Sequence, residues 1–168
     1  MIEKNLANPE KRTDPEAKDD LLAQWNAFLD NRAGTGLFIP RRLRPSPPAV
    51  VWPHVLVNDT LDDPDLLALQ QLSYCSDELA AGSGNIMNVR PNYGTGILPS
   101  VFGAEIFVMD AGTDTLPTSR ALKGGVDAVR RVLAAGIPDP YVGYGKKCFS
   151  MGEHFKKLFA GYPKISKY

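Results

Sequence analysis

Apolar side chains recur three and four positions apart in several stretches of the chain, which is the spacing of an amphipathic helix. Residues 16–30 show this spacing, and residues 60–81 show it over a longer span. In the longer stretch Thr60 is the predicted N-cap, Asp63 stands in capping-box position, and Gly82 follows the last periodic residue. We therefore expect one helix near residues 16–30 and one long helix from 60 to 81.

Two further helices are expected in the second half of the chain. A stripe of valine and leucine at residues 126–133 marks one of them, and Gly136 ends it. Ser150 is followed three residues later by Glu153, a capping-box pattern that starts the other helix. The glycine-interrupted stretch 141–145 is expected to be a connector.

Few strands are expected between these helices. Residues 86–89 and 105–108 are short apolar runs of strand type, separated by a polar turn and a short apolar turn. Pro91 has no N–H for a ladder, so the first strand should end before it. We expect the two strands to be neighbours and roughly parallel.

Polar side chains follow the first of these strands. In barrels and open α/β sheets, ligands bind beyond the carboxyl ends of strands. An arginine, an amide, a phenol and a hydroxyl stand there beside glycines that leave space; they are Arg90, Asn92, Tyr93 and Thr95. We predict that these four bind a small polar substrate, with Arg90 as the anion contact, and we identify no catalytic residue. In the alternative, Arg90 forms a structural ion pair and Asn92 shapes the turn.

The composition is that of an ordinary globular domain. The chain has 168 residues, 43% of them hydrophobic and 23% charged, and its formal net charge is zero. This balance indicates neither a nucleic acid nor a membrane surface as a partner. No apolar run approaches the roughly 20 residues of a membrane helix, and the charged N-terminus contains no secretory signal, so we expect a cytoplasmic protein. Cys75 and Cys148 are then expected to be free thiols.

Two other groups of residues are candidates for chemistry. The proline-rich stretch 35–53 carries the cluster Arg41-Arg42-Leu43-Arg44, whose guanidinium groups either clasp carboxylates or phosphates or belong to a solvated loop. His54 is expected to be packed or hydrogen-bonded, because no second ligand lies at metal spacing, and His154 is expected to face solvent. The sequence motifs of a serine nucleophile elbow, a zinc protease and a phosphate-binding loop are absent.

The stretch from Arg90 to Glu105 also resembles a family signature. It reads Arg-Pro-Asn-Tyr-Gly-Thr-Gly-Ile-Leu-Pro-Ser-Val-Phe-Gly-Ala-Glu and is similar to a signature of the uroporphyrinogen decarboxylase-like superfamily, above all of an uncharacterised bacterial branch. Shorter segments resemble the same branch along nearly the whole chain; they are 6–12, 25–29, 44–48, 57–59, 70–72, 113–118, 136–139 and 162–164.

This resemblance implies the fold of that superfamily, a (β/α)₈ barrel, which takes about 250 residues. A chain of 168 residues is too short to close such a barrel. We therefore expect an α/β protein that is the helix-rich N-terminal half of an incomplete TIM barrel, with few short strands, from a truncated gene product or a fragment. Residues 1–34 would form an N-terminal arm and helix, and residues 35–168 the half-barrel. Its open sheet edges favour self-association or pairing with a missing C-terminal half.

The resemblance also implies two kinds of chemistry. Characterised members are tetrapyrrole decarboxylases, which are lyases, or zinc-dependent methyltransferases that move a methyl group between a corrinoid and a thiol. Residues 52–56 stand about where the decarboxylases have an arginine motif, and residues 92–96 stand about where they have an aspartate. Neither residue type is present, which argues against porphyrinogen decarboxylation.

The zinc ligands of the methyltransferases lie in the C-terminal half of that family, and His54, His154, Cys75 and Cys148 do not supply their motif. We therefore expect the N-terminal portion of a protein that acts on a small molecule. This portion is expected to be inactive alone and to hold no cofactor, with zinc and corrinoid joining the complete protein. The alternative is a non-catalytic half-barrel or a partner-binding subunit.

Overall fold

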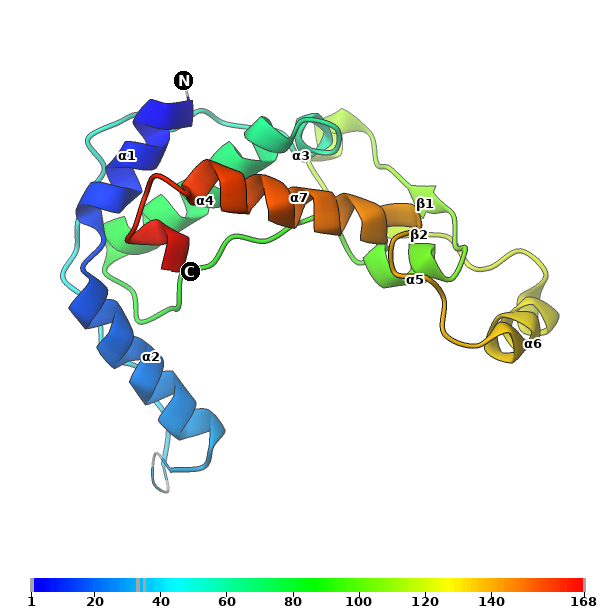
Figure 1. Ribbon diagram of the computed structural model, residues 1–168, viewed down its shortest axis with the longest axis horizontal. Helices are drawn as coiled ribbons and strands as arrows, with labels where there is room; N and C mark the ends of the chain where they lie inside the picture. The colour runs from blue at the N-terminus through cyan, green and yellow to red at the C-terminus, as the bar shows by residue number, and fades with distance from the viewer. Residues whose placement is uncertain (1, 33, 35, 168) are drawn as a thin grey trace. The chain divides into compact units, whose positions relative to one another are not determined.

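A computed structural model describes residues 2–32, 34 and 36–167 of the chain (Figure 1). Met1, Ala33, Thr35 and Tyr168, which fall at or near the ends of the predicted ranges 1–34 and 35–168, lie outside the described residues. The described residues form seven α-helices, two short 3₁₀ helices and one pair of two-residue strands. The expectation of a helix-rich α/β protein with few short strands is confirmed at this level.

The chain divides into two compact units that interleave along the sequence. Unit 1 combines Met1–Pro53, Ala68–Val89 and Leu158–Tyr168, and unit 2 combines His54–Leu67 and Arg90–Lys157. Two long helices, α4 (Pro64–Ala81) and α7 (Gly143–Phe159), contribute residues to both units. The predicted boundary at residue 34 concerns the half-barrel and stays a prediction.

Unit 1 is built from helices at both ends of the chain and the greater part of α4. Helix α1 spans Ile2–Arg12, α2 spans Pro15–Leu29, and a 3₁₀ turn, η2, spans Ile165–Lys167. The Asp14 side chain caps α2 by accepting hydrogen bonds from two N–H groups of its first turn, which confirms the helix predicted near residues 16–30. The Glu10 carboxylate accepts hydrogen bonds from the backbone N–H groups of residues 164 and 165, so η2 is fastened to α1.

The predicted start of the long helix is wrong. Thr60 ends a separate short helix, α3 (Val57–Thr60), and its hydroxyl donates to the Val57 carbonyl. Asp63 is the residue that caps α4, because its carboxylate accepts from the N–H groups of residues 65 and 66. The predicted end is confirmed, since α4 stops at Ala81 and Gly82 follows with a φ of 61°.

Unit 2 contains the two strands. β1 (Ile106–Phe107) pairs antiparallel with β2 (Thr118–Ser119), and Ile106 lies opposite Ser119. The short helix α5 (Ile97–Val101) precedes β1, and a 3₁₀ turn, η1 (Ala111–Thr113), lies between the strands. The connection from β1 to β2 is too short for the crossover that parallel strands need, so only an antiparallel pair can form.

The predicted strand at residues 86–89 is not formed, and the predicted parallel pairing is therefore wrong. This segment is irregular and follows α4, where the Cys75 thiol donates to the Asn88 carbonyl at 3.4 Å. The Glu78 carboxylate accepts from the Ser83 hydroxyl and the Asn85 amide just before it. Side chains of α4 thus hold this segment along the helix, and one of its backbone carbonyls, that of Asn88, accepts from a side chain instead of from a strand.

For the last two helices of unit 2, the predicted end of the first is confirmed and the predicted start of the second is wrong. Helix α6 (Gly125–Ala135) ends at Gly136 as expected, and Figure 1 shows it set apart from β1 and β2. Helix α7 begins at Gly143, so Ser150 lies inside it and the predicted capping box there is wrong. A β-carbon on Gly145 would overlap the Pro140 carbonyl oxygen, so this glycine allows the chain to turn closely into α7.

Candidate functional site

Helix α7 lines an open cleft in unit 2 together with Leu61, Asp62, Pro64 and Tyr93. The cleft has a volume of about 610 Å³, which is within the range of small-molecule sites. Lys146, Ser150 and His154 are spaced four residues apart along α7, and Lys157 follows one turn later. This spacing places the four on one face of the helix, so that face carries the polar groups of the cleft.

Tyr93 forms part of the cleft wall and is only 5% exposed. Its ring meets the Tyr144 ring edge-on, with 6.0 Å between the ring centroids. The Lys147 ammonium nitrogen lies 5.8 Å from the Tyr93 ring centroid and 5.2 Å from that of Tyr144. Burial raises the pKa of the Tyr93 phenol above its ordinary value, and the neighbouring Cys148, Asp62 and Tyr144 raise it further.

Lys147 holds this corner of the cleft together. Its ammonium nitrogen donates to the Leu61 carbonyl at 2.9 Å and to the Asp62 carboxylate at 2.6 Å. The stretch after α3 is therefore joined to α7 by one cation that also faces two aromatic rings. The sequence offered no direct signal for this role, because the helix that carries Lys147 was predicted to begin after it.

His154 is half-buried rather than solvent-facing, so the prediction for this residue is wrong. Its Nε2 atom is buried and lies 2.9 Å from a carboxylate oxygen of Asp65. The direction of approach is not that of a hydrogen bond, and the contact is an ion pair only when the imidazole is protonated. The first turn of α4 covers the imidazole, which the pattern of α7 alone does not reveal.

The four residues predicted to bind a substrate lie in different surroundings. Tyr93 lines the cleft, whereas Arg90 and Thr95 are exposed and Asn92 is half-buried. Arg90 forms no ion pair with any residue that the structure describes, so the alternative of a structural ion pair is not supported. A ligand-binding role for Arg90, Asn92 and Thr95 stays a prediction.

The two glycines of this turn make room for the protein's own chain. Gly94 has a φ of 84°, and a β-carbon there would overlap the Pro117 carbonyl oxygen. A β-carbon on Gly96 would lie 2.6 Å from the side chain of Ile106. The close approach that glycine permits is therefore to the segments around β1 and β2, and the space expected for a ligand is filled by them.

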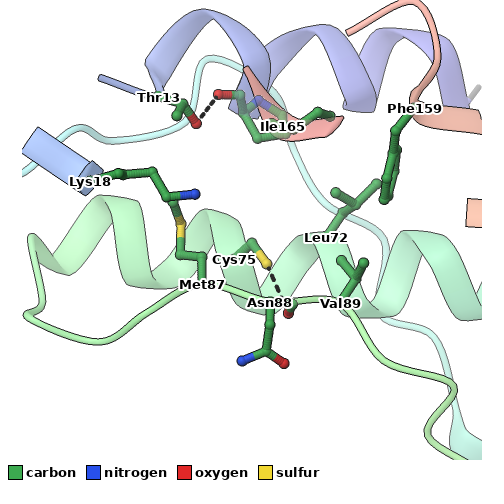
Figure 2. Close-up of a pocket in the computed structure, with 10 residues that line it drawn as sticks. Thr13, Lys18, Leu72, Cys75, Met87, Asn88, Val89, Phe159 and Ile165 are labelled. Atoms are coloured by element: carbon green, nitrogen blue, oxygen red, sulfur yellow. Dashed lines mark hydrogen bonds between the residues drawn. The ribbon is translucent and has the colours of Figure 1, made fainter. Parts of the chain in front are cut away.

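Unit 1 contains a second, much smaller cavity, which Figure 2 shows in close-up. Lys18, Cys75 and Met87 line it beside apolar side chains, and its volume of about 30 Å³ is enough for one or two water molecules. Burial lowers the pKa of the Lys18 ammonium to about 8 and raises the pKa of the Cys75 thiol to about 11. The cavity is too small for a substrate and belongs to the interior of the unit.

The remaining candidates supply no second site. The His54 side chain is 79% exposed and lies 3.9 Å from the Asp114 carboxylate. The prediction that His54 is packed is therefore wrong. Cys75 and Cys148 are free thiols, as predicted. Within residues 2–32, 34 and 36–167, no three histidine, cysteine, aspartate or glutamate side chains are placed to share a metal ion. None of the described helices has the length and apolar character needed to cross a membrane.

Comparison with known proteins gives no relative for this chain. No family model matches it, and no curated protein and no solved structure is significantly similar to it.

Proposed function

We propose that the chain is the N-terminal part of a uroporphyrinogen decarboxylase-like protein, folded as part of an incomplete barrel, and that its α7 cleft binds a small acidic molecule. One observation carries the proposal: Tyr93, which belongs to the signature stretch 90–105, forms the wall of a lysine-lined cleft. The resemblance supplies the class of protein, and the charges of the cleft supply the class of ligand.

The charges in the cleft leave two lysines available for a ligand. Lys147 is paired with Asp62, His154 faces Asp65, and Glu153 accepts a hydrogen bond from Lys156 at 2.8 Å. Lys146 and Lys157 line the same cleft, and among the described residues neither has a carboxylate within 4.0 Å. Ammonium groups that form no close ion pair attract carboxylate or phosphate, because the charge-assisted hydrogen bonds of such a ligand replace those made to water.

The class of reaction is taken from the resemblance and is one of two types. The first is the decarboxylation of a tetrapyrrole, and the second is a methyl transfer that depends on corrinoid and zinc. The described residues present no zinc-ligand set, and we assign no step of either reaction to this chain. What the cleft contributes is binding: two lysines for anionic groups, the Ser150 hydroxyl between them, and the Tyr93 ring and the Met151 side chain for an apolar body.

Titration calorimetry of the 168-residue chain tests this function, with coproporphyrin and citrate as tetrapyrrole and non-aromatic polycarboxylate probes. The double variant Lys146→Ala/Lys157→Ala should weaken binding of an acidic probe by tenfold or more, because each lost charged contact is worth about 1.5 kcal/mol or more. Lys4→Ala/Lys11→Ala is the matched control, because it removes the same two charges from exposed positions of α1 that do not line the cleft. Equal losses in both variants, or no binding of either probe, would refute the cleft as the site.

A partner-binding, non-catalytic role is the second candidate, and helix α6 favours it. Its apolar residues Val126 and Leu133 are 67% and 74% exposed, and Ile137 just beyond its end is 99% exposed. Adjacent exposed apolar residues favour association with another surface. Sedimentation velocity over a range of concentrations would show a concentration-dependent dimer if this face pairs with a second copy, and a monomer at all concentrations would contradict self-association.

A further inference from the structure

The proline-rich segment at residues 41–48 has an exposure pattern that repeats every three residues. Leu43 and Ser46 are half-buried, whereas the other residues of the segment are exposed; these are Arg41, Arg42, Arg44, Pro45, Pro47 and Pro48. The segment contains neither helix nor strand. A period of three is that of the polyproline II helix, which has three residues per turn and no internal hydrogen bonds.

Covalent geometry alone restricts most of this segment to the polyproline II conformation. Proline fixes φ near −65°, and a residue that precedes proline is held in the extended region. Residues 44–48 read Arg-Pro-Ser-Pro-Pro, so each of them is a proline, precedes one, or both. None of the described peptide bonds is cis, so the prolines do not break the extended path.

The proline-rich segment 41–48 forms an extended ridge, and one edge of this ridge is hydrogen-bonded to the rest of unit 1. The Leu43 N–H donates to the Gly82 carbonyl at 3.0 Å, and the Ser46 N–H donates to the Leu79 carbonyl at 2.8 Å. The Ser46 carbonyl in turn accepts from the Arg12 guanidinium, whose Nε lies 2.8 Å away. The two bonded residues are three apart, so they lie on the same edge, and the other two edges face outward.

We propose that residues 42–48 are a docking site for a protein module that recognises polyproline II helices, with aromatic slots for proline rings and an acidic pocket for arginine. Arg42, Pro45 and Pro48 are spaced three apart and therefore lie along one outward edge. Modules of the SH3 type bind such edges in aromatic-lined grooves. The N–H groups of residues 43 and 46 are already bonded to the protein's own carbonyls. These two residues lie on the edge that such a groove does not contact.

Charge complementarity identifies the acidic pocket of the partner. The Arg41 guanidinium lies 3.2 Å from the Asp20 carboxylate, so its charge is already balanced within unit 1. Arg42 is exposed, and among the residues that the structure describes it has no carboxylate partner. A carboxylate on the docking module would supply the partner that Arg42 lacks, by a bidentate contact.

The ridge is also pre-organised for binding. Its conformation is held by proline rings and by contacts to unit 1, so little conformational entropy remains to be lost when a partner docks. Gly82 makes this fastening close, because a β-carbon there would overlap the Leu43 carbonyl oxygen and lie 2.8 Å from the Pro45 nitrogen. The site is independent of the α7 cleft and does not rest on the proposed ligand of that cleft.

The test is titration of the 168-residue chain with an SH3 domain whose specificity pocket carries carboxylates, at low and high salt. We expect binding that Arg42→Ala and Pro48→Ala each weaken by about tenfold or more. Arg41→Ala and Ser46→Ala are the controls. Arg41→Ala removes a charge that is already paired, and Ser46→Ala shortens a side chain on the edge that faces unit 1. Both should change the affinity less than twofold. All four variants should keep the wild-type circular dichroism spectrum, since only exposed or half-buried side chains are shortened.

Three results would overturn the proposal. The first is no binding at 1 mM of the SH3 domain under conditions in which that domain binds an arginine- and proline-containing control peptide. The second is equal weakening by Arg41→Ala and Arg42→Ala, together with an unchanged affinity in Pro48→Ala, because this pattern indicates a general attraction between opposite charges. A short single-stranded DNA serves as the second probe, and binding to it that only the arginine variants weaken would also assign the segment to non-specific anion binding.

Discussion

The two units hold their non-helical segments in opposite ways. In unit 1 the segment before residue 53 is tied to the helices by backbone hydrogen bonds and by the Arg12 guanidinium, which reaches the Ser46 carbonyl, the Asn8 side chain and both oxygens of Ser76. In unit 2 the connections on either side of α6 are more exposed, and Ala128 is the only described residue of α6 that is buried.

This difference shows that polar anchors can replace a sheet in ordering an irregular chain. Unit 1 contains no strand among its described residues, yet its proline-rich segment follows a defined path because each fastened carbonyl or N–H group has a partner in a helix or directly after its end. Helix α6 lacks such anchors and keeps its apolar face open. We therefore expect substitutions at the anchors of unit 1 to cost far more stability than substitutions on α6.

The largest effect is expected for Arg12→Met. The methionine keeps much of the aliphatic volume but removes the charged hydrogen bonds to the Ser46 carbonyl and to Ser76 in a partly buried site. Each lost hydrogen bond to a charged group is worth about 1.5–3 kcal/mol, so the free energy of unfolding should fall by about 3–5 kcal/mol. Urea denaturation measures this fall, and a loss below about 1 kcal/mol would show that the anchor is not what orders unit 1.

The next effect in size is expected for Gly82→Ala. This glycine has a φ of 61°, and it is also the point where the chain at Leu43 comes closest to the end of α4. An alanine would carry the cost of the left-handed conformation and would push the proline-rich segment away, for a total of about 2–3 kcal/mol. Ser83→Ala, at the next position, tests a lost side-chain hydrogen bond without either backbone effect and should cost less than Gly82→Ala in the same denaturation experiment.

The extent to which the sequence predicts these features depends on the kind of interaction. The periods of α2, α4 and α6 come from apolar side chains within each helix, so residues 16–30, 60–81 and 126–133 point to the right elements. The starts of α4 and α7 depend on which of two polar residues caps a helix and on a glycine that turns closely past Pro140, and neither choice is visible in a hydrophobic pattern.

The candidate site shows the same limit. Tyr93 was singled out because it stands in a glycine-containing turn, and the structure places it in the cleft wall. The same reasoning included Arg90 and Thr95, which are exposed, because spacing in a turn does not tell which side chains converge. Lys147 and His154 depend on contacts with Asp62 and Asp65, more than 80 residues earlier in the chain, and no local pattern carries that information.

A smaller effect, of the opposite sign, is expected for Lys18→Met in unit 1. Burial lowers the pKa of Lys18 from 10.5 to about 8, so between these pH values the unfolded chain binds more protons at this site than the folded one. The free energy of unfolding should therefore rise with pH above about 8 in the wild type, whereas below pH 8 the buried charge destabilises the fold by about 1–2 kcal/mol after allowance for solvent screening.

Urea denaturation at pH 7, 8 and 8.8 separates this contribution from that of Cys75. The pKa of Cys75 is raised from 9.0 to about 11, so its effect lowers stability with pH and is confined to pH values above about 9. Lys18→Met should be more stable than the wild type at pH 7 and should lose the rise between pH 8 and 8.8, whereas Cys75→Ala should retain that rise. A wild-type stability that stays flat between pH 8 and 8.8 would contradict the lowered pKa of Lys18.

The smallest effect is expected for Leu133→Ser on α6. Leu133 is 74% exposed, so its replacement removes little buried apolar surface and should change the free energy of unfolding by less than about 0.5 kcal/mol. Leu72→Ala in unit 1 is the matched comparison, because Leu72 is 2% exposed and its truncation should cost about 2–5 kcal/mol. If Leu133→Ser costs more than about 1 kcal/mol, α6 is covered in solution. A cost that grows with protein concentration would then identify a second copy of the chain as the cover, because only association makes stability depend on concentration.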